Sequence, residues 1–250
     1  MRSRRIALLA AAVTIVVAAL VGVLRVRPLG AQRYMRFDPN VAYDGRFTFV
    51  RVKYIVRWRS GWEFDYPAME RNFMKLTDEL TTLRPHTEES NIHTFDDPEL
   101  LKFPIAYLSE PGGWYLNPKE AEGLRNYLAK GGFLWVDDFM RDEWVQFERQ
   151  IRLVLPDARF VRLDPSHPIY NAFFHIDSLT LHHPQATELR GEFYGIYEDN
   201  DPSKRLMVVI DYNTDVGDFM EWSGQGWFPV NVTNDAYKIA IDYIIYGLTH

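Results

Sequence analysis

Apolar and polar residues begin to follow a regular pattern near residue 47. Residues 48–56 (TFVRVKYIV) alternate, with Arg51 and Lys53 on the face opposite the valines, which predicts a strand covered on one face only. From residue 69 to residue 83, apolar residues recur every three or four positions and predict an amphipathic helix that Pro85 ends.

Two short apolar runs, at residues 104–109 (PIAYLS) and 133–136 (FLWV), predict strands buried on both faces. The helix between them has a clear start, because Asn117 can cap it and Glu120 follows three positions later, as in a capping box. Gly131 suits its end. A strand, a helix and a second buried strand predict a right-handed parallel unit.

The pattern continues with a helix over residues 144–155 and a strand over 159–163. Residues 192–198 and 205–212 read as an antiparallel strand pair, and residues 236–248 as a final helix. Helices that alternate with buried strands indicate an α/β domain with a mainly parallel sheet.

The first 24 residues differ from the rest. Nineteen residues without a charge, from 6 to 24, would form a helix of roughly 28 Å, close to the thickness of a bilayer's hydrocarbon core. We expect a retained transmembrane helix, with a cleaved signal segment as the alternative. Residues 25–46 then form a tether and residues 47–250 the domain. Arginines before the apolar run favour an extracytoplasmic, periplasmic location for that domain.

Charge is unevenly divided along the 250 residues. Residues 1–36 contain seven of the 28 Lys and Arg and none of the 34 Asp and Glu, so the remainder has a net charge of 21 − 34, or −13. Such a body repels phosphates, which argues against a nucleic-acid partner. The chain contains no cysteine, so thiol nucleophiles, thiolate metal ligands and disulfides are excluded.

Four stretches occur together in one order: FTFVRVKY, KEAEGLRNYLAKGGFLWVDDF, SHPIYNAFF and IDYNTDVGDFMEW. They resemble the domain-of-unknown-function family 4159, whose fold is similar to that of the class I glutamine amidotransferases, over about residues 47–248. The resemblance implies a flavodoxin-like three-layer sandwich. It implies no activity, because a shared fold does not transfer a function.

Amidotransferases of this class use a cysteine on a tight turn after a strand, and this chain has none. Ser109 ends a predicted strand, but Glu110 and Pro111 follow it, and proline lacks a backbone donor that an oxyanion would need. We therefore expect a non-catalytic protein. No phosphate-binding turn follows the first strand, so we expect no cofactor.

Three acids, Glu110, Asp137 and Asp138, follow predicted parallel strands, and ligands of α/β sheets bind at that edge. Adjacent side chains at the end of a strand diverge, so we expect one aspartate to cap a turn or helix and the other to face the cleft. A ligand or metal role for the pair is the alternative to a purely structural one.

Two further groups of residues have the chemistry of a site. Asn213, Asp215 and Asp218 could offer oxygen ligands to a hard cation, although an acidic surface loop explains them equally well. His167, between two prolines, could be a base, a metal ligand or a hydrogen-bonded strut. The sequence leaves the metal, if there is one, unknown.

Aromatic residues make up 15% of the chain, and several fall in predicted loops or strand ends where they can contact a partner. The candidates are Tyr34, Phe37, Trp58, Trp62, Trp114, Tyr115 and Trp227. We expect a membrane-tethered scaffold subunit bound to other subunits of a membrane complex, for example an energy-converting complex such as a photosynthetic reaction centre with its antenna. The alternative is a hydrolase or carbohydrate-binding protein that uses Asp137, Asp138 and His167, with or without a cation.

Overall fold

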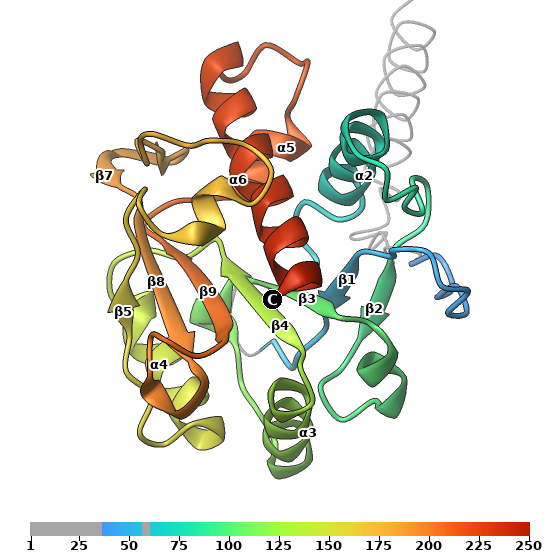
Figure 1. Cartoon of the computed structure of the whole chain (residues 1–250), viewed down its shortest axis with the longest axis vertical. Helices are drawn as coiled ribbons and strands as arrows, with labels where there is room; N and C mark the ends of the chain where they lie inside the picture. Colours follow the sequence, from blue (N-terminus) through green and yellow to red (C-terminus); the bar gives the residue numbers. More distant parts are fainter. Residues whose placement is uncertain (1–36, 57–60) are drawn as a thin grey trace, which may run out of the picture. The chain divides into compact units, whose positions relative to one another are not determined.

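A computed structural model describes residues 37–56 and 61–250, and residues 39–250 form one compact unit (Figure 1). The apolar segment at residues 6–24, Tyr34 and Trp58 lie outside the described residues. Among the described helices, none has the length and apolar character needed to cross a membrane.

A seven-stranded sheet runs through the unit in the order β2-β1-β3-β4-β9-β8-β5. Its first five strands are parallel, in the order typical of flavodoxin-like sheets, and β8 is antiparallel to both of its neighbours. The strands are β1 (Val50–Val52), β2 (Asn91–His93), β3 (Ile105–Ser109), β4 (Phe133–Asp137), β5 (Val161–Arg162), β8 (Glu192–Tyr197) and β9 (Leu206–Tyr212). The predicted mixed α/β class and the antiparallel pair near the end of the chain are confirmed.

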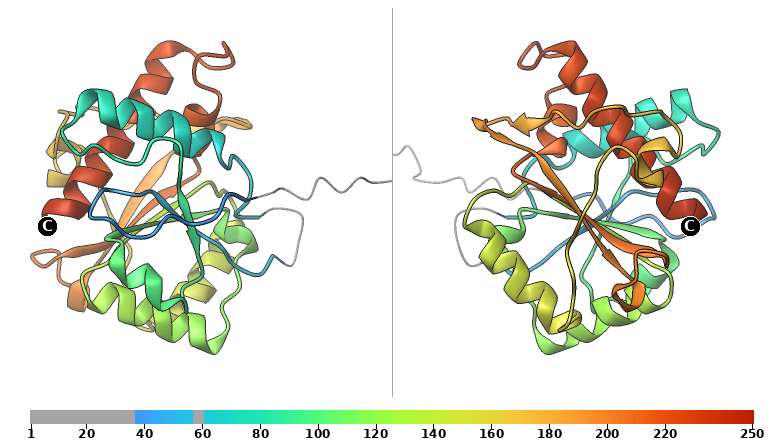
Figure 2. Two further views of the ribbon diagram at one scale, coloured as in Figure 1. Left: turned by 90° about the vertical axis from the view of Figure 1, so that its right-hand side faces the viewer. Right: turned by 60° about the vertical axis from the view of Figure 1, so that its left-hand side comes forward.

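Helices cover both faces of this sheet, as a flavodoxin-like sandwich requires (Figure 2). One face is covered by α2 (Ala68–Leu80) and α6 (Val230–Thr249), and the other by α3 (Pro118–Ala129) and α4 (Glu143–Val154). The short α5 (Val216–Glu221) packs against both α2 and α6. Smaller elements complete the unit: β6 (His182–His183), β7 (Ala186–Arg190) and the 3₁₀ turns η1 (Pro98–Lys102), η2 (Pro111–Gly113), η3 (Pro168–Asn171) and η4 (Glu198–Asn200).

The start of α3 is fixed by the capping box that the sequence predicts. The Asn117 side chain accepts from the backbone N–H of Lys119 at 2.8 Å and of Glu120 at 3.0 Å, and the Glu120 carboxylate accepts from the Asn117 N–H at 2.8 Å. These bonds satisfy three donors that a bare helix end would leave unpaired.

Asn117→Ala should therefore lower the free energy of unfolding by about 1 kcal/mol. Asn126→Ala is the matched control, because Asn126 lies exposed within the same helix and alanine is the better helix former. Thermal unfolding of the full-length chain in mild detergent, followed by circular dichroism, measures both. An equal effect of the two substitutions would mean that the cap contributes nothing.

The first strand differs from its prediction. Arg51 is fully buried instead of facing solvent, because β1 lies between β2 and β3 and both of its faces are covered. Its Nε binds the Glu70 carboxylate of α2, and its Nη1 donates to the carbonyls of Trp62 (2.9 Å) and Phe64 (2.8 Å). The buried Glu70 carboxylate thus takes the place of the solvent that the alternating pattern predicts around Arg51.

The compact unit also begins before the predicted boundary at residue 47. The Asn40 side chain exchanges hydrogen bonds with the backbone of Ile92 in β2, both at 2.8 Å, and the Val41 N–H donates to Asn91 at 2.8 Å. Tyr43 packs edge-on against Phe103. Residues 39–46 are therefore part of the domain and not of a tether.

Candidate functional site

Strained backbone positions gather where the parallel strands end. Glu110 follows β3 with φ 49°, Asp138 follows β4 with φ 62°, and Asn213 follows β9 with φ 57°. Asp65, in the loop between β1 and α2, has φ 64°. Non-glycine residues rarely adopt this left-handed conformation, and they concentrate at functional sites. Left-handed residues thus follow strands at the edge that the sequence singles out, and Asp199 and Asn200 adopt the same conformation in the turn between β8 and β9.

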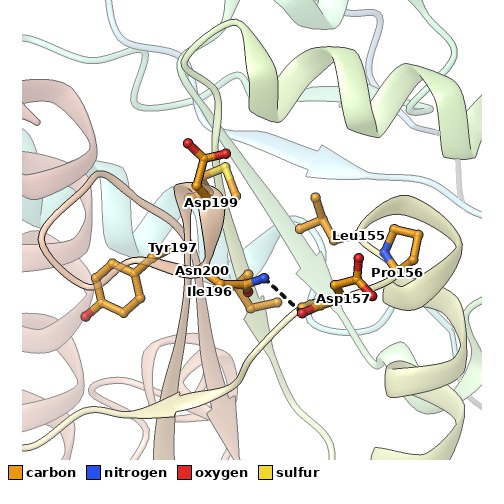
Figure 3. A pocket seen from close by; sticks show the side chains of 9 residues that line it. Leu155, Pro156, Asp157, Ile196, Tyr197, Asp199 and Asn200 are labelled. Carbon is orange, nitrogen blue, oxygen red and sulfur yellow. Dashed lines mark hydrogen bonds between the residues drawn. The ribbon is translucent and has the colours of Figure 1, made fainter.

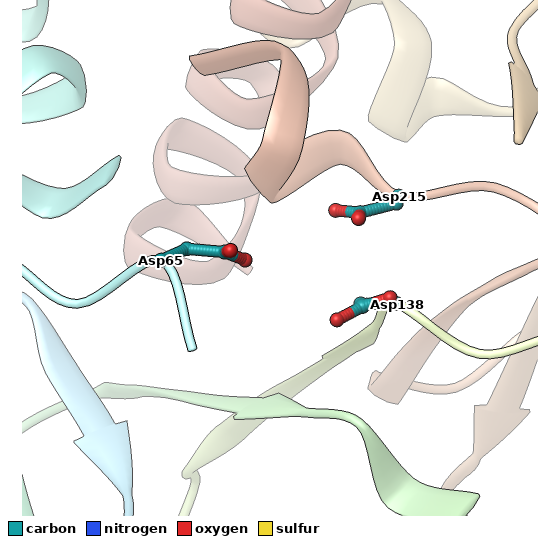
Figure 4. A group of neighbouring side chains, drawn as sticks. All are labelled: Asp65, Asp138 and Asp215. Atoms are coloured by element: carbon teal, nitrogen blue, oxygen red, sulfur yellow. The ribbon is translucent and has the colours of Figure 1, made fainter. Parts of the chain in front are cut away.

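Three of the acids at this edge face one another (Figure 4). One carboxylate oxygen from each of Asp65, Asp138 and Asp215 lies within 4.8 Å of the other two. Asp65 forms a second such group with Asp218 and Glu221. We call these five residues the acidic edge. Oxygen atoms at this spacing are the ligands that calcium or magnesium takes in proteins.

Burial and mutual repulsion raise the pKa values across the acidic edge. Burial raises the pKa of Asp138 well above its ordinary value, and the charges of Glu110 and Asp65 add to the rise. Burial also raises the pKa of Asp215 well above its ordinary value, and the charges of Asp138 and Asp218 add to the rise. Burial and the neighbouring Asp65 raise the pKa of Glu221 to about 7.

Only part of this repulsion is relieved by a cation of the chain. Burial raises the pKa of Asp65, the positive charge of Arg51 opposes that rise, and Asp218 adds to it. Asp215 is also held as the N-cap of α5, where it accepts from the Asp218 N–H at 2.8 Å. The acidic edge can therefore relieve its remaining repulsion by taking up protons or by binding a cation.

Asp137, next to Asp138, has a different role. It is fully buried, and its carboxylate accepts from the N–H groups of Val216 (3.1 Å) and Gly217 (2.9 Å) and from the Tyr107 hydroxyl (3.0 Å). Burial raises its pKa to about 7 although these hydrogen bonds oppose the rise. Asp137 thus has the capping role expected of one of the two aspartates, at the start of α5, and Asp138 lies in the acidic edge.

The loop after β9 contributes unequally. Asp215 and Asp218 join the acidic edge, whereas the Asn213 side chain accepts from the Arg141 N–H at 3.0 Å and donates to Glu192 at 3.4 Å. Asn213 thus supports a turn and is not part of the edge. Asp215 is only 2% exposed, so the alternative of an acidic surface loop is wrong for this residue.

His167 lies at the opposite edge of the sheet. One ring nitrogen lies 2.9 Å from the Tyr197 hydroxyl and the other accepts from the Ile169 N–H at 3.2 Å. Tyr197 pairs with Leu206 at the start of β9, which is the amino edge of the parallel strands. His167 is a strut between η3 and β8, and it cannot act together with Asp138.

The aromatic candidates divide by burial. Trp114 and Trp62 are 0% and 5% exposed, so the prediction that they meet a partner is wrong: they pack inside this domain. Phe37 and Tyr115 are half-buried. Trp227 is 71% exposed and remains available to a partner.

Sequence reasoning missed Asp65, and it missed the buried Arg51 side chain whose positive charge acts on Asp65. Asp65 follows no recognisable strand end, since β1 stops at Val52 and a long loop intervenes. The signal that could have found it is topological: the loop after β1 leaves the same edge as the loops after β3 and β4. Acids in that loop should have been considered together with Asp138.

A separate hollow of about 210 Å³ lies between the end of α4 and the turn after β8 (Figure 3). Its walls include Leu155, Asp157, Tyr197 and Asn200, and the Asn200 amide donates across it to the Asp157 carbonyl at 2.9 Å. Within the described ranges, the groups of three acids or histidines that could hold a metal all lie at the acidic edge instead.

Comparison with known proteins agrees with the resemblance read from the sequence. Residues 48–248 match the model of one family, described as Domain of unknown function (DUF4159). No curated protein matches the chain. The match covers nearly all of the compact unit, including β1, the acidic edge and α6, so the chain belongs to the DUF4159 family.

Proposed function

We propose that this protein is a non-catalytic, membrane-tethered binding subunit of a larger membrane protein complex, with its domain on the extracytoplasmic side. The domain is an amidotransferase-like fold that has been reused as a scaffold. An energy-converting complex, such as a photosynthetic reaction centre with its antenna, is one possible host. The apolar segment at residues 6–24 would supply the tether.

The observation that supports this proposal is the residue in the turn after β3. Glu110 has φ 49° and ψ 52°, the sharp left-handed turn in which a hydrolase of this architecture presents its nucleophile. A carboxylate takes the place of a thiol or hydroxyl there. Pro111 follows and has no N–H to stabilise an oxyanion.

The neighbouring hydroxyl does not replace the missing nucleophile. Ser109 is fully buried at the end of β3, and its Oγ lies 3.5 Å from Asp138. The alternative of a hydrolase that pairs Asp138 with His167 loses its support, since the two residues lie at opposite edges of the sheet. The acidic edge can bind a cation through its carboxylate oxygens.

Purification from the native membrane in a gentle detergent tests the proposal. A C-terminal tag is suitable because α6 ends at an exposed His250. We expect other membrane proteins to co-elute with the chain in a constant ratio, in an assembly much larger than its own 29.3 kDa. Elution as a lone monomer would contradict a scaffold role.

A comparison of the wild type with one matched variant distinguishes a scaffold from an enzyme. Glu110→Gln keeps the shape of the side chain in the turn and removes its charge, so the variant should co-purify with the same proteins as the wild type. Both preparations are then assayed for hydrolysis of esters, amides and glycosides. A turnover present in the wild type and lost in the folded variant would show that the protein is an enzyme.

A further inference from the structure

The segment that runs from the end of α5 into the first residues of α6 has no charge. Residues 222–234 read WSGQGWFPVNVTN, thirteen positions without Asp, Glu, Lys or Arg, in a chain of which 25% is charged. We call this segment the tryptophan loop. It is bounded by Glu221 and Asp235, so the uncharged region is limited to the loop itself.

The loop exposes its large apolar side chains to solvent. Trp227 is 71% exposed and Val230 is 75% exposed. Both exposed fractions are larger than that of any other large apolar side chain in the described residues. Trp222 lies edge-on against Trp227 at 5.6 Å, and Phe228 lies edge-on against Phe219 at 4.8 Å. The first contact keeps the two tryptophans together, and the second holds Phe228 on the buried core of the domain.

Two hollows are lined by residues of the tryptophan loop. One, of about 430 Å³, is lined by Thr180, His182, Phe219, Trp227 and Phe228. The other, of about 370 Å³, is lined by Ser223, Gly226, Phe228 and Asn234. Gly224 and Gly226 have φ 75° and 81°, which allows a tight turn at the tip. The loop lies at the start of α6, which is drawn at the top of Figure 1.

The charges of the molecule indicate which kind of surface the loop fits. The body has a net charge of −13, so a charged protein surface or an anionic membrane would require charges in the loop to match it. A zwitterionic lipid surface requires none. An exposed tryptophan in an uncharged segment suits the boundary between headgroups and acyl chains, where an amphipathic ring is stable.

We propose that the tryptophan loop inserts Trp227 and its neighbours into the headgroup layer of a zwitterionic lipid membrane. An exposed aromatic side chain in an uncharged segment can enter the headgroup layer of a membrane. This contact would fix the orientation of the domain on the membrane. The inference goes beyond the proposed function and does not depend on a partner complex.

Because the chain has no cysteine, one introduced cysteine can carry a unique label. Gln225→Cys, at the tip of the tryptophan loop, is labelled with an environment-sensitive fluorophore in the full-length chain, which is reconstituted into phosphatidylcholine vesicles. We expect a blue-shifted emission and quenching by lipids that carry a nitroxide near the headgroup. A label at Glu122→Cys, exposed on α3 at the bottom of Figure 1, should show neither effect.

Substitutions of exposed apolar residues identify the side chain responsible. Trp227→Ser in the Gln225-labelled chain should abolish the shift and the quenching. Val145→Ser, which removes a 57% exposed apolar side chain from α4, should leave both unchanged. Adding anionic lipid to the vesicles should reduce the quenching, because the acidic body is repelled.

A label at residue 225 that remains water-exposed on vesicles would overturn the inference. If the same label became shielded only after native membrane proteins were added, the loop would be a protein-docking surface instead, and the inference would equally fail. The vesicles contain no partner protein, so this result is independent of the co-purification experiment. Either proposal can fail while the other stands.

Discussion

Arg51→Met is expected to lower the free energy of unfolding by about 3–5 kcal/mol, the usual cost of removing one partner from a buried ion pair. Methionine fills much of the same volume, but it leaves the buried Glu70 carboxylate without its cation and the Trp62 and Phe64 carbonyls without a donor. Urea unfolding of the full-length chain in mild detergent, followed by tryptophan fluorescence, measures the loss.

The double variant Arg51→Met/Glu70→Leu separates the ion pair from the loop contacts. It should recover a large part of the loss, because the uncompensated carboxylate is then gone as well. What it does not recover is the contribution of the two carbonyl contacts that hold the loop before Asp65. Arg51→Lys should fall between wild type and Arg51→Met, since lysine keeps the charge but not the planar fork. A double variant no more stable than Arg51→Met would mean that Glu70 is not compensated by Arg51.

Arg51 also shows where reading the sequence reaches its limit. Its partner lies 19 residues away, and nothing in an alternating strand pattern reveals that an ion pair will replace water. The same holds for Asp65, which reaches Asp138 and Asp215 only because three separate loops leave one edge of the sheet. Such contacts depend on tertiary packing and not on local spacing.

Elements that are decided by residues close together in the sequence were predicted more reliably than these tertiary contacts. The apolar runs at β3 and β4, the capping box at Asn117 and the antiparallel pair of β8 and β9 are each decided by a few neighbouring residues. The strand β2 was missed because three residues, NIH, are too short to show a period. For the acidic edge, the sequence placed Asp138 at a strand end but could not tell which of the adjacent Asp137 and Asp138 would join the other acids.

Substitution of those two aspartates by asparagine should change stability in opposite directions at pH 8. Asp137→Asn should lower the free energy of unfolding by about 2–4 kcal/mol, because an amide has one acceptor oxygen where the carboxylate receives three hydrogen bonds at the start of α5. Asp138→Asn should raise it by about 1–2 kcal/mol, because one charge leaves a repulsive group. Asparagine also accepts the left-handed backbone of residue 138.

The pH dependence of folding stability tests independently whether the acidic edge destabilises the folded chain. Burial and nearby charges raise the pKa values of Asp138 and Asp215. The pKa values of Asp137 and Glu221 rise to about 7, with burial as the largest cause. Carboxyl groups of an unfolded chain have pKa values of about 4. Between about pH 4 and pH 7 these carboxyls hold more protons in the folded chain than in the unfolded chain, so they lower its stability as pH rises. Burial lowers the pKa values of His167 and His183, which oppose this fall in the same range. Thermal unfolding should occur at a higher temperature at pH 5 than at pH 8.

Asp138→Asn should make this dependence shallower, since it removes one of the groups with a raised pKa and lowers the repulsion on Asp215. A cation bound at the acidic edge would act in the same direction, so the comparison is made in the presence of a chelator and again with calcium. If Asp138→Asn destabilised the domain as much as Asp137→Asn does, Asp138 would be a structural cap like its neighbour. The acidic edge would then be a consequence of folding, with no repulsion left for a ligand to relieve.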